Sequence, residues 1–223
     1  MESHIVPSVA GKKTSDLKTF IKEHQENNFL SPKKKGQSQQ FEGDQMKQYE
    51  RLQKLKKLQL DDIWLNAFDH GYEPKKILGA GSFGTVCLTK CTHTGQTYAV
   101  KLIKNFAKHE YSLVKVVREI QILRLLEAMQ IEDEVPSYSP GLIDLFFPDS
   151  EKESGKLVNI FLVMEASDID LKSMISISKD GSITPDHLKI ITYNLLCCLK
   201  YLHSSNIIHR DIKPSNILIN ENC

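Results

Sequence analysis

Hydrophobic residues recur along this chain with two different periods, and the change of period separates predicted helices from predicted strands. Between residues 44 and 65 the apolar positions follow helical spacing, so we expect one amphipathic helix there. From residue 72 onward, apolar and polar residues alternate in short segments bounded by turn residues, which is typical of β-strands. The first three predicted strands are a segment that ends at residue 78 and the segments 85–89 and 97–103.

A helix and two more strands are expected in the middle of the chain. Helical spacing of the apolar residues returns from about residue 110 to residue 129. Apolar runs at 142–147 and 157–164 predict two further strands. The charged stretch between them, residues 148–156, is expected to be a linker.

The last part of the chain is predicted to be helical. A short helix is expected at 171–177 and a longer one at about 185–203. Thr184 is a suitable N-cap for the longer helix, and Pro185 suits its first position. Five strands with one helix among them, followed by helices, predict an α+β fold with two lobes rather than alternating βα units.

Composition adds a basic tail to this picture. The chain has 223 residues with 29 Lys and Arg, 28 Asp and Glu, and 40% hydrophobic residues, which suits a globular protein. Residues 1–60 carry 12 of the cations and 7 of the anions, so the near-zero net charge hides a basic N-terminal part. Residues 1–44 lack clustered large apolar side chains and are expected to be disordered. We interpret this tail as solvated and expect no nucleic-acid partner, although its charge also suits acidic partners or a membrane surface.

The helical extension at residues 45–70 has two interpretations. The segment 56–60, Lys-Lys-Leu-Gln-Leu, places two cations before alternating apolar residues, as in a docking peptide. An amphipathic helix that packs on the body of the protein explains the same residues. The sequence leaves both interpretations open, so a docking partner that binds through residues 45–66 remains a hypothesis.

Several classes of protein are not expected. No run of about 18 uncharged apolar residues occurs, so we expect no membrane span. The first residues lack a basic region followed by a long apolar stretch, so we expect no secretory signal. The five cysteines are odd in number and lack metal-ligand spacing, and we interpret them as reduced thiols of a cytoplasmic or nuclear protein.

Three glycines, Gly79, Gly81 and Gly84, follow the first predicted strand. Dinucleotide-binding folds use the same spacing, but there a helix must follow the glycines. Here the segment 85–89 continues as a strand, so the glycines are expected at a hairpin tip, where backbone amides can approach phosphate groups. A merely glycine-rich hairpin remains the alternative at this point.

Lys101 lies in the middle of the third predicted strand among apolar residues. A cation in such a position is unfavourable unless it is paired. Glu119 follows 18 residues later on the predicted helix and can hold the ammonium group while Lys101 contacts phosphates. The alternative is that Lys101 extends to solvent from a strand edge.

A polar segment after the last helix combines three groups suited to phosphoryl transfer. Asp211 can orient a hydroxyl group and accept its proton, Asn216 offers a neutral oxygen ligand for Mg²⁺, and Lys213 brings positive charge near the transferred group. The order of these elements resembles the eukaryotic protein kinases, with a glycine-rich loop, a strand lysine, a helix glutamate and a catalytic loop. The resemblance covers residues 72–223 and nothing before them.

The resemblance also suggests a subfamily. Lys213, two residues after the catalytic aspartate, is typical of serine/threonine kinases, and the segment 214–216, Pro-Ser-Asn, is most similar to mitogen-activated protein kinases. Mitogen-activated protein kinase kinases and cyclin-dependent kinases remain alternatives. The resemblance implies ATP and Mg²⁺ as cofactors, a protein substrate, and an upstream kinase as a possible partner of the extension.

By the same resemblance, the nucleotide site can be assigned to individual residues. Met164 would be the gatekeeper beside the adenine, whose edge the backbone of Glu165 and Ser167 would bind, while Asp170 would reach the ribose or serve only as a helix N-cap. Val86, Ala99 and Leu218 would enclose the base. The full expected ATP site is Leu78, Gly79, Ala80, Gly81, Ser82, Phe83, Gly84, Val86, Ala99, Lys101, Met164, Glu165, Ser167, Asp170 and Leu218.

The sequence departs from the family pattern after the catalytic loop. No Asp-Phe-Gly triplet or activation loop follows Asp211, so the second Mg²⁺ ligand beside Asn216 is missing and the chain alone is expected to be inactive. The alternative is a non-catalytic nucleotide-binding or decoy module. The expected organisation is a disordered basic tail (1–44), a helical extension (45–70), an N-terminal kinase lobe (72–164), and a hinge with a partial C-terminal lobe (165–223).

Overall fold

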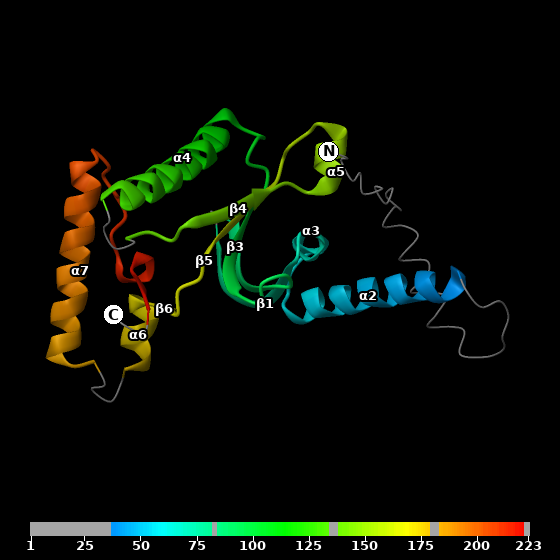
Figure 1. Cartoon of the computed structure of the whole chain (residues 1–223), viewed down its shortest axis with the longest axis horizontal. Coiled ribbons are helices and arrows are strands. Elements are labelled where there is room, and N and C mark those ends of the chain that lie inside the picture. Colours follow the sequence, from blue (N-terminus) through cyan, green and yellow to red (C-terminus); the bar gives the residue numbers. More distant parts are fainter. Residues whose placement is uncertain (1–36, 82–83, 134–137, 179–182, 221–223) are drawn as a thin grey trace.

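The computed structural model describes residues 37–81, 84–133, 138–178 and 183–220, with side chains left out at a few helix ends (Figure 1). The helices are α2 (Gln37–Lys57), α3 (Leu65–Asp69), α4 (Glu110–Asp133), α5 (Asp149–Ser154), α6 (Leu171–Ile177) and α7 (Pro185–Ser204), with 3₁₀ turns η1 (Asp62–Trp64) and η2 (Pro214–Asn216). The strands are β1 (Tyr72–Gly81), β2 (Gly84–Cys91), β3 (Thr97–Ile103), β4 (Leu142–Phe146), β5 (Ile160–Glu165), β6 (Ile169–Asp170) and β7 (Leu218–Ile219). None of the helices in these segments is both long and apolar enough to cross a membrane.

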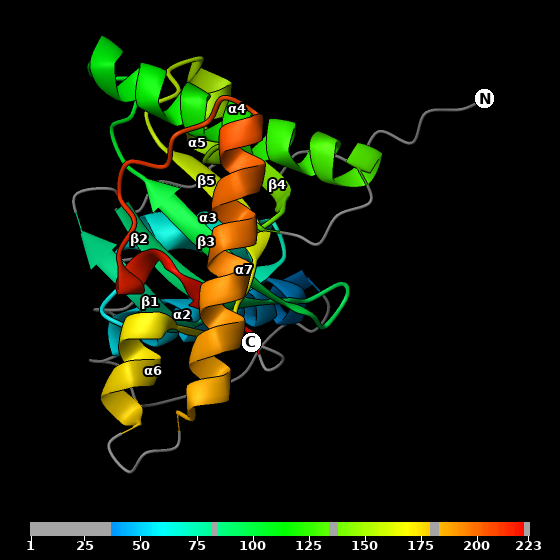
Figure 2. The same ribbon diagram turned by 90° about the vertical axis from the view of Figure 1, so that its left-hand side faces the viewer.

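A five-stranded antiparallel sheet forms the centre of the structure. Its strand order is β1-β2-β3-β5-β4, and the short strands β6 and β7 pair in a second sheet. Figures 1 and 2 show α6 and α7 together on one side of the large sheet, with α2 on the other side. This arrangement, with α4 as the helix inserted after β3, confirms the predicted α+β fold.

The two faces of the large sheet have different cores because successive residues of a strand point to opposite faces. Val100 and Leu102 of β3 are buried on one face, in a cluster that includes Trp64 of η1. On the other face, Leu162 of β5 is buried together with Val116 of α4. Burying each of these side chains contributes about 1.5–3 kcal/mol. Because Trp64 belongs to the extension before residue 72, this extension forms part of the hydrophobic core.

The beginning of α2 lies inside the segment that we expected to be disordered. The helix starts at Gln37, whereas the expected tail runs to residue 44. Residues 37–44 include Gln and Glu, which have good helix propensity, and the sparseness of apolar side chains does not reveal that propensity. Residues 1–36 of the expected tail lie outside the described residues.

The single helix predicted at 44–65 is wrong because α2 ends at Lys57 and two short helical turns follow. Gln59 has a left-handed φ of +57°. The amide of Leu60 donates to the carbonyl of Leu55 at 2.9 Å, and the amide of Gln59 donates to Lys56 at 3.0 Å. This is a Schellman motif, in which Leu55 and Leu60 supply the accompanying buried apolar contact.

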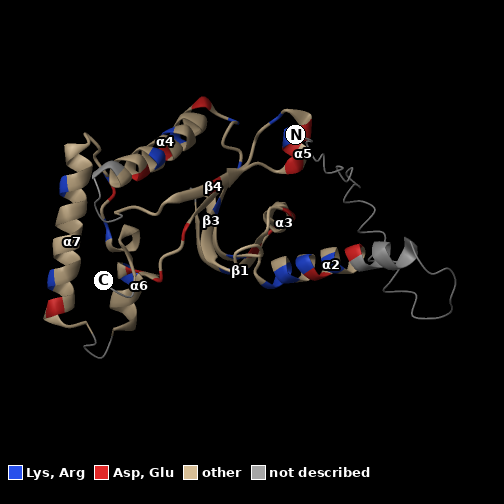
Figure 3. Ribbon diagram, in the orientation of Figure 1, with Lys and Arg blue, Asp and Glu red and all other residues tan. Residues whose placement is uncertain are grey.

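The docking-peptide interpretation of residues 56–60 conflicts with this packing. Leu60 is buried, and Leu58 packs against the same core, so the two leucines are not displayed for a partner. Arg51 Nη1 also binds Asp69 Oδ1 at 2.8 Å and joins α2 to α3. The other interpretation, a helix packed on the body, describes this end of α2. Figure 3 shows that the Lys and Arg residues of α2 gather in its second half.

The charged linker expected at 148–156 contains a short helix, α5. Asp149 and Glu151 in its first turn complement the helix dipole. The amide of Asp149 donates to Asn66 Oδ1 of α3 at 3.3 Å, and Gly155 ends the helix with a φ of +68°. A six-residue helix has too few apolar positions to produce a recognisable period, which explains why the sequence pattern did not reveal it.

The helices after the hinge agree with their predicted boundaries. Helix α6 covers residues 171–177, and α7 runs from Pro185 to Ser204. Thr184 caps α7 by accepting a hydrogen bond from the amide of His187, and the His187 ring accepts one from the amide of Thr184. Asn206, with a φ of +57°, terminates the helix in a second Schellman motif.

Candidate active site

The glycine-rich segment forms the tip of the β1–β2 hairpin. Gly79 pairs with Val86, and Gly81 pairs with Gly84. Ser82 and Phe83 lie outside the described residues. A Cβ atom at Gly79 or Gly81 would meet no described atom within 4 Å, so packing does not explain either glycine. Among the described residues, nothing prevents a phosphate group from approaching the backbone at these two positions.

Gly84 has a different role from the other two glycines. Its φ is +110°, and a Cβ atom there would collide with the carbonyl oxygen of Leu102 on the neighbouring strand. We expect Gly84→Ala to lower the free energy of unfolding by about 1–3 kcal/mol, because it adds this collision to an unfavourable backbone conformation. Urea denaturation measures this change. Gly79→Ala is the matched control and should change stability by less than about 1 kcal/mol, and equal losses in both variants would contradict the assignment.

Strand register places the expected adenine and phosphate residues on one face of the sheet. Val86 pairs with Lys101, which in turn pairs with Leu162 of β5. Ala99, two residues before Lys101 in β3 and therefore on the same face, pairs with Met164 of β5. Directly paired residues share a face, so Val86 and Lys101 lie on the side that α4 covers. The sequence predicted these residues separately, and the register brings them together.

Lys101 and Glu119 form the ion pair expected from their sequence positions. Lys101 Nζ lies 2.5 Å from Glu119 Oε1, and the Lys101 side chain is 16% exposed. Helix α4 presents Glu119 to the sheet because Val116 and Ile120, on the same side of the helix, pack against the core that contains Leu162. The ammonium group is therefore partly withdrawn from water and compensated by a carboxylate, as a mid-strand lysine requires.

Asp211, Lys213 and Asn216 converge in the loop after α7. Lys213 Nζ lies 2.8 Å from Asp211 Oδ2, and Asn216 Nδ2 donates to the same oxygen at 2.8 Å. These contacts, that of Lys213 first, lower the pKa of the Asp211 carboxyl group. Arg210 precedes it with a left-handed φ of +66°. The aspartate is thus ionised at neutral pH, while it remains accessible to solvent.

The loop is held by one side-chain bond within itself and by main-chain contacts with the start of α6. Asn216 Nδ2 also donates to the carbonyl oxygen of Asp211 at 2.8 Å, which closes the turn around η2. The amide of Leu171 donates to the carbonyl of Ile217 at 2.8 Å, and Asp170 pairs with Leu218 between β6 and β7. The start of α6 and the end of the loop after α7 therefore hold each other in place.

The hinge between the sheet and the helices includes a bond that the sequence did not predict. Glu165 Oε2 accepts a hydrogen bond from the amide of Gly141 at 3.1 Å, and the Glu165 amide donates to the Gly141 carbonyl at 3.1 Å. A Cβ atom at Gly141 would crowd the Glu165 carboxylate. Because Gly141 lies 24 residues from Glu165 in a loop, no local pattern could have revealed this pairing.

Asp170 acts as a helix N-cap in the structure. Its carboxylate accepts a hydrogen bond from the amide of Ser173 at 2.9 Å and one from Ser173 Oγ at 2.5 Å. These bonds lower the pKa of the Asp170 carboxyl group. The capping role is one of the two expected from the sequence, and a contact with ribose remains a prediction.

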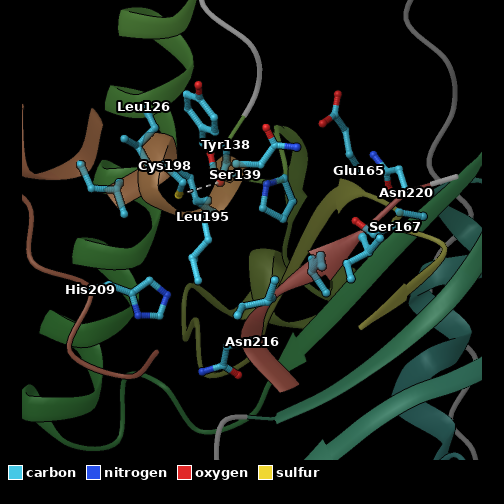
Figure 4. Close-up of a pocket in the computed structure, with 18 of the residues that line it drawn as sticks. Leu126, Tyr138, Ser139, Glu165, Ser167, Leu195, Cys198, His209, Asn216 and Asn220 are labelled. Atoms are coloured by element: carbon cyan, nitrogen blue, oxygen red, sulfur yellow. Dashed lines mark hydrogen bonds between the residues drawn. The ribbon is translucent and has the colours of Figure 1, made fainter. Parts of the chain in front are cut away.

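A cavity of about 1250 Å³ lies between α4, α7, residues 165–167 and the loop after α7. Figure 4 shows Glu165 and Ser167 at one side of it and His209 and Asn216 at another. Its lining includes Glu165, Ser167, Asn216 and Leu218 from the expected site, but neither Lys101 nor Asp211. Among the described contacts, no hydrogen bond or ion pair joins the Lys101–Glu119 pair to the Asp211 group. The expected site residues therefore lie in two separate groups, called half-sites below. One is Lys101 with Glu119, and the other is Asp211 with Lys213 and Asn216.

Part of the apolar wall of this cavity comes from α7, whose helical period the sequence did predict. Ile191, Leu195 and Leu202 line it. Cys198, on the same helix, donates a weak hydrogen bond to the carbonyl of Tyr138 at 3.8 Å, and burial raises the pKa of its thiol. A thiol with a raised pKa is a poor nucleophile, so Cys198 has a packing role in this wall.

The fold agrees with a comparison of the sequence against known protein families. Residues 72–223 match the protein kinase domain family, and the chain therefore belongs to it. Over 152 residues, the chain is 35% identical to mitogen-activated protein kinase 13 of Oryza sativa subsp. indica and 36% identical to mitogen-activated protein kinase 16 of Arabidopsis thaliana. The matched region covers 68% of this chain, but only 28% and 24% of those two proteins. The chain thus spans about a quarter of the length of these relatives.

Proposed function

We propose that this chain carries the nucleotide-binding lobe and catalytic loop of an ATP-dependent serine/threonine protein kinase of the mitogen-activated type. The reaction would transfer the γ-phosphate of ATP to Ser or Thr hydroxyl groups of proteins. The observation that carries the proposal is the 2.5 Å ion pair of Lys101 and Glu119, on the sheet face to which Val86 of the glycine-rich hairpin also belongs. This arrangement holds a cation ready for phosphate oxygens.

The nucleotide would lie along this face of the sheet. Backbone amides of residues 79–84 would approach the phosphates, and Lys101 would contact the α- and β-phosphates. Val86, Ala99 and Leu218 would enclose the adenine, beside Met164. Glu165 and Ser167 would bind the adenine edge through their backbone. The open space above Gly79 and Gly81 supports this assignment.

Asp211 would perform the chemistry on the acceptor. Its lowered pKa keeps it ionised, and an ionised carboxylate can orient a hydroxyl group and accept its proton. Lys213, which is bound to the same carboxylate, would bring positive charge toward the transferred phosphoryl group. The two half-sites must share one nucleotide for transfer to occur.

The catalytic loop fits a Mg²⁺ ion in part. Asp211 and Asn216 offer carboxylate and amide oxygens, which are the ligand type that Mg²⁺ prefers. Asn216 binds Asp211 through its side-chain nitrogen, so this bond does not use the amide oxygen. No group of three His, Cys, Asp or Glu side chains gathers as a metal site among the described residues. Asn216 would therefore hold the ion together with phosphate oxygens, and the ion would neutralise phosphate charge.

The subfamily and the partners are proposed from the relatives that the chain resembles. The similarity to mitogen-activated protein kinases favours that type over mitogen-activated protein kinase kinases and cyclin-dependent kinases. A protein substrate and a cytoplasmic or nuclear location are proposed on the same basis. An upstream kinase or other partner of residues 45–66 would have to use the exposed side chains of α2, such as Met46 and Tyr49, because the leucines near residue 60 are packed.

Asp211→Asn tests the proposed chemistry. We expect phosphorylation of Ser/Thr peptides by the full-length gene product, measured with labelled ATP, to fall about 10²–10⁴-fold, because an amide cannot accept the proton. The dissociation constant for MgATP should stay within about threefold, because Asp211 is not expected to carry nucleotide binding. Asp186→Asn, on the exposed first turn of α7, is the control.

Each result of this test separates the alternatives. Undiminished phosphate transfer by the Asp211→Asn variant would refute the role of Asp211. Nucleotide binding without any transfer by the unmodified full-length protein would favour a non-catalytic nucleotide-binding or decoy module. Absence of both nucleotide binding and transfer would reject the proposed function.

A further inference from the structure

The connection between β3 and α4 is held in one conformation by a short segment that precedes β5. The connection begins with Lys104, Asn105 and Phe106, and Asn105 has a left-handed φ of +53°. Phe106 is buried in the same cluster as Val116, which lies one turn before Glu119 on α4. The connection therefore packs against the same apolar surface that holds the first half of α4 beside the sheet.

Two hydrogen bonds join the connection to residues 158 and 159. The amide of Phe106 donates to the carbonyl of Val158 at 2.8 Å. The amide of Asn105 donates to Asn159 Oδ1 at 3.1 Å. Residues 158 and 159 lead directly into β5, whose first residue, Ile160, is buried in the same cluster as Phe106. The connection and the apolar surface beneath α4 are therefore fixed to one another.

Glu151 of α5 orders residues 158 and 159. Its Oε2 accepts hydrogen bonds from the amide of Val158 at 2.6 Å and the amide of Asn159 at 2.8 Å. Its Oε1 accepts a third bond, from Asn159 Nδ2. This third bond fixes which way the Asn159 amide points, and it leaves Oδ1 directed at the amide of Asn105. One carboxylate thus satisfies three donors, and a charged acceptor makes such bonds strong.

We infer that Glu151 is a positioning residue for the Lys101–Glu119 pair and acts through Asn159, the β3–α4 connection and the buried contact of Phe106 with α4. This inference rests on the proposed function, because the pair matters for catalysis only if it serves a nucleotide. Glu151 would raise the affinity for MgATP without touching it. Its substitution would loosen the first half of α4 before it loosens the strands.

Glu151→Ala is compared with Glu153→Ala, which removes an exposed carboxylate two residues further along the same segment. Glu151→Gln is the conservative variant, since it keeps one acceptor oxygen. The full-length gene product is used throughout. Its dissociation constant for MgATP is measured by calorimetry, and amide hydrogen exchange is followed in α4 and β3 well below the unfolding temperature.

We expect Glu151→Ala to raise the dissociation constant for MgATP about three- to tenfold, with Glu151→Gln in between and Glu153→Ala unchanged. Exchange of the amides at 116–120 should become about tenfold faster in Glu151→Ala, while the amides of β3 keep their rates. In a Glu119→Gln background, Glu151→Ala should change the dissociation constant less than about twofold, because its effect passes through Glu119.

Two results would overturn the inference. The first is equal behaviour of Glu151→Ala and Glu153→Ala in α4 exchange. The second is a Glu151→Ala effect on MgATP binding that is as large in the Glu119→Gln background as in the unmodified protein, which would indicate general destabilisation. If the unmodified protein does not bind MgATP, the proposed function fails, but the exchange of α4 still decides whether Glu151 positions that helix.

Discussion

Lys101→Met is expected to abolish phosphate transfer by the full-length gene product, with a loss of about 10³-fold or more. The methionine fills the space of the lysine stem between Val86 and Leu162 but supplies no positive charge for the phosphates. A positioned cation that stabilises developing charge in a partly dehydrated site accounts for losses of this order. Labelled-ATP transfer to Ser/Thr peptides measures the rate.

The control for this experiment is Lys104→Met. Lys104 lies three residues further along the chain and pairs with Asp61 at the surface, away from the glycine-rich hairpin. The Lys104→Met variant should retain transfer within about twofold, since exposed ion pairs contribute little. Transfer by the Lys101→Met variant at a rate near that of Lys104→Met would remove the basis of the proposed kinase activity.

Trp64→Ala is expected to lower the free energy of unfolding of the chain by about 3–5 kcal/mol. Trp64 is 1% exposed, and its ring meets that of Phe161 edge-on, with 5.4 Å between the centroids. The substitution leaves a cavity between the extension and the sheet, which cannot close because β5 is held on both sides by β3 and β4. Guanidinium denaturation measures the change.

Tyr49→Ala provides the comparison for the tryptophan. Tyr49 lies on α2, is 38% exposed and belongs to the same extension. Its removal should change stability by less than about 1 kcal/mol. If Trp64→Ala were as mild as Tyr49→Ala, residues 55–69 would be an appended segment and not part of the core.

Much of the fold followed from local patterns that the structure retains. Alternation predicted β2 and β3, and the helical period together with Thr184 and Pro185 predicted α7. The break after Lys57 was missed because the left-handed residue at that position is Gln59 and not glycine, so no residue type marked it. Helix α5 was missed because it is held by contacts with α3 instead of an apolar face of its own.

The candidate site was predictable where the residues that form it lie close together in the sequence. Asp211, Lys213 and Asn216 fall within six positions, and their contacts within the loop form as the residue types suggest. The partner of the Glu165 carboxylate was not predictable, because Gly141 carries no side chain and lies in another segment. The role of Glu151 was not predictable either, because in the sequence it is one charge among many in a charged segment.

The sequence alone determined that Lys101 stands among apolar residues and that Asp211, Lys213 and Asn216 fall within six positions, because residue type and spacing belong to the chain whatever the fold. Only the tertiary structure decided that the segment before residue 72 contributes to one of the two cores of the sheet, that Lys101 meets Glu119, and that Glu151 is connected to the β3–α4 connection through Asn159. Those contacts depend on the register of strands and on where connections meet in space. A linear pattern of hydrophobic and polar residues contains neither.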